Sequence, residues 1–164
     1  MRSSIKIDAN LFRKYDVKRG LRNDDGTGVL VGLTNIGNVV GYERHDDGSL
    51  SPIDGKLYYR GFEIQDLVHP LFEEKRFGFE EVAYLLLSGR LPDMEELHTF
   101  RALLTDNMPL EQKTILHIIE LEGSNIMNIL ARSVLELYTF DKTPDDTSRD
   151  NLMRQSVELI SKFP

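Results

Sequence analysis

The side chains best suited to acid–base or metal chemistry are four histidines and two pairs of neighbouring aspartates. The histidines are His45, His69, His98 and His117, and the aspartates are Asp46, Asp47, Asp145 and Asp146. No two histidines have the helical spacing of metal ligands, and no histidine–carboxylate cluster resembles a zinc site. The aspartates are paired only in sequence, whereas acid–base catalysis needs carboxyl groups that face each other across a cleft. We interpret them as turn and capping residues, and we predict no catalytic residue and no metal site in this chain.

Motifs for nucleotide binding and for nucleophilic catalysis are absent from the sequence. The glycines of residues 26–32 resemble a dinucleotide-binding loop, but their spacing differs by one residue and they precede a predicted strand instead of opening a helix. There is no Walker A sequence, no Gly-x-Ser-x-Gly elbow and no cysteine. The sequence therefore predicts no bound cofactor.

The composition is that of a globular chain with an acidic body. The 164 residues carry a net charge of −7 and are 40% hydrophobic, and no apolar run approaches the roughly 20 residues of a membrane-spanning helix. An acidic body argues against a nucleic-acid-binding surface. Because there are no cysteines and no signal-peptide core, we expect a cytoplasmic protein. Neither a membrane nor a nucleic acid is expected as a partner.

The first 22 residues differ in charge from the rest of the chain. They hold seven basic and two acidic side chains, whereas residues 23–164 hold 13 basic and 25 acidic ones. A basic segment of this kind either meets an anionic ligand or an acidic surface, or is a solvated leading segment.

Residues about 27–61 show the pattern of short β-strands. The runs at 29–31, 39–42 and 57–59 are rich in β-prone residues. We predict turns at 35–38, at Asp47–Gly48 and at Asp54–Gly55, because glycine tolerates the positive φ of tight turns. Small hairpins are therefore expected here.

From about residue 63 to residue 163 the pattern is helical. A short first helix is predicted to end at Pro70, because proline disfavours a helical conformation at the residue before it. The next helix is apolar on nearly all sides and has Gly89 after its last turn, where a left-handed residue commonly ends a helix. Asp93 and Glu96 then have the spacing of a capping box.

Three further helices complete the pattern. One is predicted to have Pro109 in its first turn and to end at Gly123. The second is capped by Ser124 or Asn125 and runs to Phe140, and the third is capped by Thr147. The predicted fold class is therefore mainly α, with a small N-terminal β-hairpin segment.

Several motifs, in this order along the chain, resemble the citrate synthase family. They are Gly20-Leu21-Arg22, residues 25–34, residues 55–67 around Arg60-Gly61, residues 79–92 ending in Gly89-Arg90-Leu91-Pro92, and the long helix at 128–138. On this order and spacing the chain is identified as a member of the family. The resemblance implies that residues 1–164 are a single partial domain, the N-terminal part of the large domain, with hairpins at about 27–61 and helices at about 63–163.

The resemblance also implies an activity for a full-length parent enzyme. Family members condense acetyl-CoA with oxaloacetate to give citrate and CoA, using two histidines, an aspartate and carboxylate-binding arginines from later in the family sequence. We therefore expect an acyltransferase parent and an N-terminal fragment that is inactive alone. The alternatives are a fragment of a 2-methylcitrate synthase, which uses propionyl-CoA, and a non-catalytic helical dimerisation module.

One substrate-binding residue is implied by the resemblance. In the family, an arginine in the context of Gly20-Leu21-Arg22 reaches the phosphates of CoA, and a guanidinium suits phosphate because it offers paired donors and a fixed charge. Arg22 is therefore the candidate. The alternative is an exposed arginine in a basic leading segment.

A homodimer through helices at about 125–163 is also implied, because helices of this region pack across the dimer axis in the family. Ala131 and Ser133 offer small side chains for a close helix approach. The apolar residues expected there are Ile126, Ile129, Leu130, Val134, Leu137, Met153, Val157 and Ile160. The alternative is that these helices fill the core of the monomer.

Overall fold

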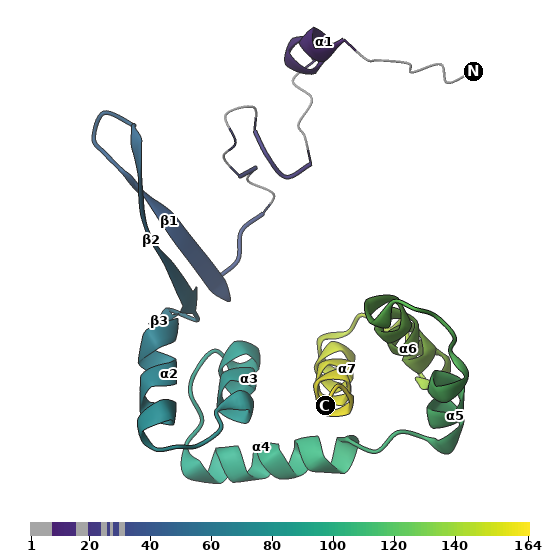
Figure 1. Ribbon diagram of the computed structural model, residues 1–164. Coiled ribbons are helices and arrows are strands. Elements are labelled where there is room, and N and C mark those ends of the chain that lie inside the picture. The colour runs from purple at the N-terminus through teal and green to yellow at the C-terminus, as the bar shows by residue number, and fades with distance from the viewer. Residues whose placement is uncertain (1–7, 16–19, 24–25, 27, 30–31) are drawn as a thin grey trace, which may run out of the picture. The chain divides into compact units, whose positions relative to one another are not determined.

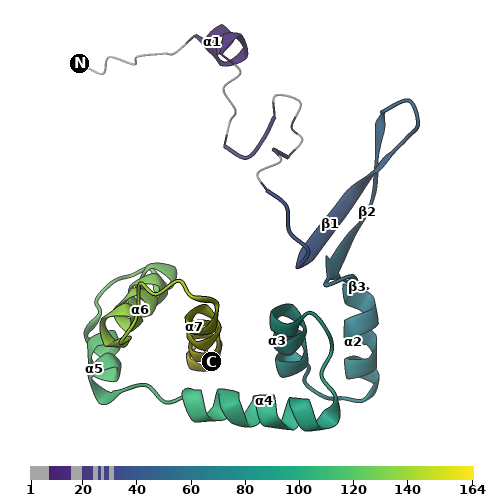
Figure 2. The same cartoon turned by 180° about the vertical axis from the view of Figure 1, so that it is seen from behind.

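The chain forms two compact units, residues 1–35 and residues 36–164. The computed structural model describes residues 8–15, 20–23, 26, 28–29 and 32–164. The first unit contains the short helix α1 (Ala9–Lys14) and a loop closed by an isolated antiparallel bridge between Arg22 and Gly28. The second unit contains a small sheet followed by the helices α2 to α7 (Figure 1, Figure 2).

A long antiparallel hairpin opens the second unit. It consists of β1 (Gly37–Arg44) and β2 (Leu50–Tyr59), and its register shifts between Val40 and Tyr42. The predicted turn at Asp47–Gly48 is confirmed, since Gly48 has a φ of 82° in the connection between the two strands.

A second, tight turn joins the hairpin to the helices. β3 (Phe62–Glu63) pairs with the end of β2, and the two residues between them, Arg60 and Gly61, have φ values of 49° and 90°. Positive φ at both central residues is typical of a type I′ hairpin turn. The Arg60 side chain donates from Nε and Nη2 to the carbonyl oxygen of Leu86, at 3.1 and 2.6 Å. It thereby satisfies a carbonyl in the last turn of α3, where a helix lacks partners of its own.

Two of the predicted turns coincide wholly or partly with strands. Asp54–Gly55 is part of β2, and the predicted turn at 35–38 overlaps the start of β1. One long hairpin therefore replaces several small ones, because pairing with a partner strand outweighs a local turn preference. The predicted strand at 29–31 lies mostly outside the described residues.

The rest of the chain is helical, which confirms the predicted mainly α fold with a small β segment. The helices are α2 (Ile64–Glu73), α3 (Phe79–Ser88), α4 (Met94–Asn107), α5 (Gln112–Glu120), α6 (Ile126–Phe140) and α7 (Arg149–Lys162). Among the described residues, none of these helices has the length and apolar character needed to cross a membrane.

Several helix ends were predicted correctly from local residue types. Gly89 ends α3 in the left-handed conformation, with a φ of 87°. Asp93 and Glu96 form both hydrogen bonds of a capping box at the start of α4. The Asn125 side chain accepts a hydrogen bond from the backbone N–H of Asn128 and begins α6. Each of these signals depends on residues at most four positions apart.

The prediction that Pro70 ends the first helix was wrong. Pro70 lies inside α2, which continues to Glu73, and the backbone N–H of Glu74 still donates to the Pro70 carbonyl oxygen. Proline has no backbone N–H and so removes one hydrogen bond of a helix, but its carbonyl oxygen can still accept one. Leu67 is buried on the same helix, and α2 contacts β2 and β3.

Three other helix boundaries also differ from the prediction. α5 begins at Gln112, so Pro109 precedes it, and its last residue is Glu120, not Gly123. α7 is capped by Ser148 instead of Thr147, and the Ser148 hydroxyl accepts from a backbone N–H at 3.4 Å. Serine and threonine are both good caps, so residue type alone did not separate the two positions.

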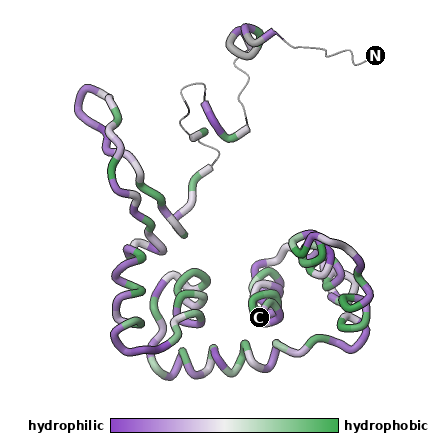
Figure 3. The backbone as a smooth tube through the Cα atoms, viewed as in Figure 1, coloured by the Kyte–Doolittle hydropathy of each residue, from purple (hydrophilic) through white to green (hydrophobic). Residues whose placement is uncertain are grey.

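The core of the second unit surrounds α4. Phe100 and Leu104 of α4 and Val157 of α7 form a buried cluster, and the partly buried Tyr84 of α3 packs against it. The rings of Tyr84 and Phe100 meet edge to face, with centroids 5.4 Å apart. Leu85 of α3 is completely buried. The core therefore joins α3, α4 and α7, while Figure 3 shows hydrophobic segments on α5 and α6 as well.

Candidate functional site

Arg22, the one predicted substrate-binding residue, is exposed in the loop of the first unit. The backbone N–H of Val29 donates to the carbonyl of Leu21 at 3.1 Å, so the loop turns back on itself. Within it, Nη1 of Arg22 donates to the carbonyl of Gly26 at 3.3 Å. This contact orients a permanent positive charge at the surface, as a phosphate ligand would require. A role in CoA binding stays a prediction.

The glycine-rich segment at 26–32 lacks the setting of a phosphate-binding loop. Gly28 is bridged to Arg22, and the next described element after the segment is the strand β1. Phosphate loops place the anion at the N-terminus of a helix. The described part of this segment therefore closes a surface loop.

The four histidines lie on separate parts of the second unit. His45 is next to β1, His69 is on α2 and His98 is exposed on α4. His117 of α5 has its Nδ1 atom 2.5 Å from a carboxylate oxygen of Glu136, on α6. Among the described residues, no three His, Cys, Asp or Glu side chains are grouped so that they could hold a metal ion. The contact of His117 links two helices.

One aspartate of each pair acts in a turn or near a helix cap, as predicted. Asp47 accepts hydrogen bonds from the hydroxyl and the backbone N–H of Ser49, at 2.6 and 2.9 Å, and these bonds lower the pKa of Asp47. Asp146 accepts from the backbone N–H of Ser148 at 2.8 Å, just before α7. Both carboxylates are thus occupied by neighbouring residues of the same loop.

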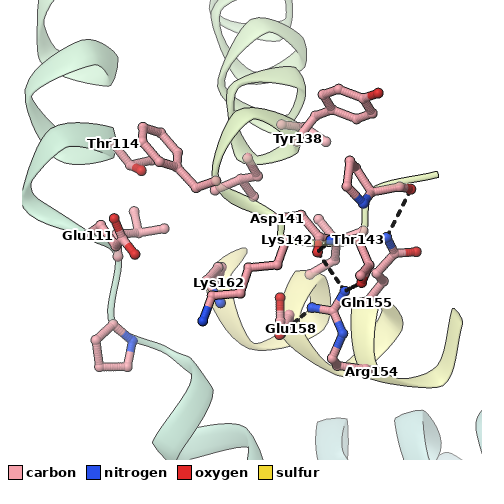
Figure 4. A pocket seen from close by; sticks show the side chains of 17 residues that line it. Glu111, Thr114, Tyr138, Asp141, Lys142, Thr143, Arg154, Gln155, Glu158 and Lys162 are labelled. Carbon is pink, nitrogen blue, oxygen red and sulfur yellow. Dashed lines mark hydrogen bonds and ion pairs between the residues drawn. The ribbon is translucent and has the colours of Figure 1, made fainter. Parts of the chain in front are cut away.

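A groove of about 780 Å³ lies between the start of α5, the C-terminal end of α6 and α7 (Figure 4). Its size is within the range of about 300–1,000 Å³ that is common for small-molecule sites. The charged side chains that line it are Glu111, Lys142, Asp141, Arg154, Glu158 and Lys162. Because acidic and basic groups are equal in number, the lining favours neither sign of charge, and it contains no histidine that could act as a base.

Arg154 is the centre of a hydrogen-bond network on one side of the groove (Figure 4). Its Nη2 atom donates to Asp141 and to Asn151, both at 2.7 Å, and Nη1 donates to Glu158 at 2.8 Å. Gln155 donates to the second oxygen of Asp141 at 2.8 Å. Sequence reasoning did not identify this network, since Asp141 and Arg154 are separated by a loop and no periodic pattern connects them.

The network holds the loop between α6 and α7 in place electrostatically. The pKa of Asp141 is lowered to about 2 by the backbone N–H of Thr143, by Gln155 and by Arg154. The hydroxyl of Tyr138 donates to Asp145 at 2.9 Å, and this bond raises the pKa of Tyr138. These groups therefore fix how α6 is connected to α7, which is a structural role.

The stability of this junction should depend on the charge of Asp141. Its folded pKa of about 2 lies below the ordinary value of 3.8, so the carboxylate stabilises the fold above about pH 4 and loses this effect as the pH falls towards 2. We expect Asp141→Asn to lower the urea midpoint at pH 6 and to flatten its dependence on pH between 4 and 2. Urea unfolding followed by circular dichroism at several pH values measures both effects.

The matched control for this experiment is Asp54→Asn, which removes an exposed carboxylate of β2. Glu96 remains in both variants, and Arg90 and the N–H of Asp93 lower its pKa to about 2. The urea midpoint of Asp141→Asn should therefore still fall somewhat between pH 4 and pH 2. An Asp141→Asn profile that runs parallel to that of the unmodified chain would contradict the assigned role.

One face of α6 is apolar and largely exposed, although Val134 and Tyr138 on this face also line the groove. None of the residues of α6 is buried, and Met127 and Leu135 are 67% and 72% exposed. The residues on this side, which we name the α6 outer face, are Met127, Leu130, Ala131, Val134, Leu135 and Tyr138. They share one side because a helix turns once every 3.6 residues. Glu136 lies on the other side, where it contacts His117. Contiguous apolar faces of this kind usually mark interaction sites.

Two residues expected at a dimer interface belong to the core instead. Val157 of α7 is 7% exposed, and Ile160 packs against the same buried cluster. The cause is that this side of α7 packs against α4. Met153 is 42% exposed and no residue of α6 is buried, so these residues remain available for the predicted interface, which stays a prediction.

Comparisons with known proteins agree on one family. The family model described as "Citrate synthase, C-terminal domain" matches residues 25–164. The 2-methylcitrate synthase 1 of Corynebacterium glutamicum is 30% identical over 149 residues, which are 90% of this chain and 33% of that protein. Citrate synthase 2 of Bacillus subtilis is 30% identical over 116 residues, which are 70% of this chain and 30% of that protein.

The fold is also similar to that of a solved structure. Citrate synthase from Thermoplasma acidophilum, in a ternary complex with carboxymethyl coenzyme A and oxaloacetate, matches 82% of this chain with a TM-score of 0.64 and 19% identity. The match covers 31% of that chain, so this chain spans about a third of the length of the relatives that it matches. Because the family model matches most of its residues, the chain belongs to the citrate synthase family.

Proposed function

We propose that this chain is the N-terminal part of the large domain of a citrate synthase. The full-length form would condense acetyl-CoA with oxaloacetate to give citrate and CoA. The family match over residues 25–164 carries the proposal. The order of a hairpin followed by helices supports it, because the family resemblance implies the same order.

A 2-methylcitrate synthase is the second candidate. The relative from Corynebacterium glutamicum that matches 90% of this chain carries that name. The two enzymes perform the same condensation on acyl groups that differ by one methylene. A pocket distinguishes one methylene by only about 1–3 kcal/mol, or roughly 10- to 200-fold in kcat/KM. The fold and the motifs that both enzymes share therefore do not distinguish a citrate synthase from a 2-methylcitrate synthase.

The full-length parent enzyme tests both candidates. We expect its kcat/KM with oxaloacetate to be about 10- to 200-fold higher for acetyl-CoA than for propionyl-CoA, measured as the rate of CoA release at several concentrations of each thioester. The opposite preference would replace the first candidate by the second. Condensation with neither thioester would contradict both and favour a non-catalytic dimerisation module.

We further propose that Arg22 binds a phosphate group of CoA in the parent enzyme. Three features support this role: the guanidinium is exposed, one of its nitrogen atoms is oriented by the Gly26 carbonyl, and the residue follows Gly20-Leu21. Arginine suits this role because its planar fork can donate two hydrogen bonds to one phosphate.

Arg22→Ala in the parent enzyme should raise the KM for acetyl-CoA by about 10- to 100-fold and leave kcat nearly unchanged. A charge-assisted hydrogen bond contributes about 1.5–3 kcal/mol, and a group that binds substrate and transition state equally affects KM alone. Initial rates at varied acetyl-CoA measure the effect. Arg44→Ala, which removes an exposed arginine of β1, is the control. An unchanged KM in Arg22→Ala would count against the phosphate role.

We propose that the chain forms a two-fold homodimer through the region of α6 and α7, about residues 125–163. The α6 outer face supports this proposal, since it is apolar and has the small side chain of Ala131 near its centre. A helix of this length spans only about 22 Å, whereas stable interfaces bury about 1,200–2,000 Å². Exposed residues of α7, such as Leu152 and Met153, would enlarge the surface.

The alternative is that these helices fill the core of the monomer. It describes α7 better than α6. α7 contributes Val157 and the polar residues Asn151 and Ser161 to the interior, whereas α6 contributes no buried residue. The α6 outer face is therefore the part of the proposed interface that a direct experiment should address first.

A further inference from the structure

We draw no further inference here: the strongest candidate, the groove of about 780 Å³ between the start of α5, the end of α6 and α7, is lined by equal numbers of acidic and basic side chains, and nothing in the structure shows what covers it.

Discussion

Purified residues 1–164 should release no CoA above the blank when they are given acetyl-CoA and oxaloacetate. The condensation needs a base that removes a proton from the acyl methyl group and donors that stabilise the developing charge. A general base contributes about 10²–10⁴-fold in rate, and a single stabilising donor about 10²–10³-fold. The four histidines lie on separate parts of the second unit, and the family resemblance implies that the catalytic histidines and aspartate come from later in the family sequence. We therefore expect a turnover at least about 10⁴-fold below that of a full-length enzyme.

The assay is well suited to this chain, because a protein without cysteine adds no background to a thiol-reactive dye that detects free CoA. The full-length parent at the same subunit concentration is the positive control. Circular dichroism must show that the chain is helical under the assay conditions, so that inactivity is not confused with unfolding. A turnover within tenfold of the full-length enzyme would overturn the interpretation as an inactive fragment.

Ala131→Arg should convert the proposed dimer into a monomer. Ala131 lies near the middle of the α6 outer face and is exposed in the single chain. An arginine there can extend into water in the monomer, but a two-fold interface would bury it against its symmetry mate without a partner charge, at a cost of several kcal/mol. Sedimentation equilibrium at micromolar concentration should give twice the 18.8 kDa chain mass for the unmodified protein and a single chain mass for the variant.

Thr139→Arg is the matched control, because residue 139 is exposed on the same helix but outside the α6 outer face. It should remain dimeric. Leu130→Arg combined with Val134→Arg adds two charges to the α6 outer face and should also give monomers. A monomeric unmodified chain, or a dimer that persists in Ala131→Arg and in the double variant, would refute the interface.

Features that depend on neighbouring residues were predictable from the sequence. The sequence predicts both the helix end at Gly89 and the capping box of Asp93 and Glu96, and the structure has both. A cap is a hydrogen bond between groups two to four residues apart, so residue type and spacing contain most of the information. The mainly α class followed from the same local patterns.

Features that depend on pairing between distant residues were assigned less well. Asp54–Gly55 has the composition of a turn, yet it lies inside β2, because the strand is defined by its register with β1. Pro70 is a residue type that commonly ends a helix, yet α2 continues past it. In both cases the hydrogen bonds and packing of the surrounding element outweigh the preference of one or two residues.

The sequence by itself determined the family, the helical class and the candidate Arg22, because each depends on residue types in a fixed order. Only the tertiary structure decided which side of each helix is covered. Val157 is buried against α4, whereas Leu135 is 72% exposed. The tertiary structure also places Asp141 beside Arg154. The loop between them is held by several hydrogen bonds at once. Periodicity shows that a helix has an apolar side, but which apolar sides meet depends on the three-dimensional path of the chain.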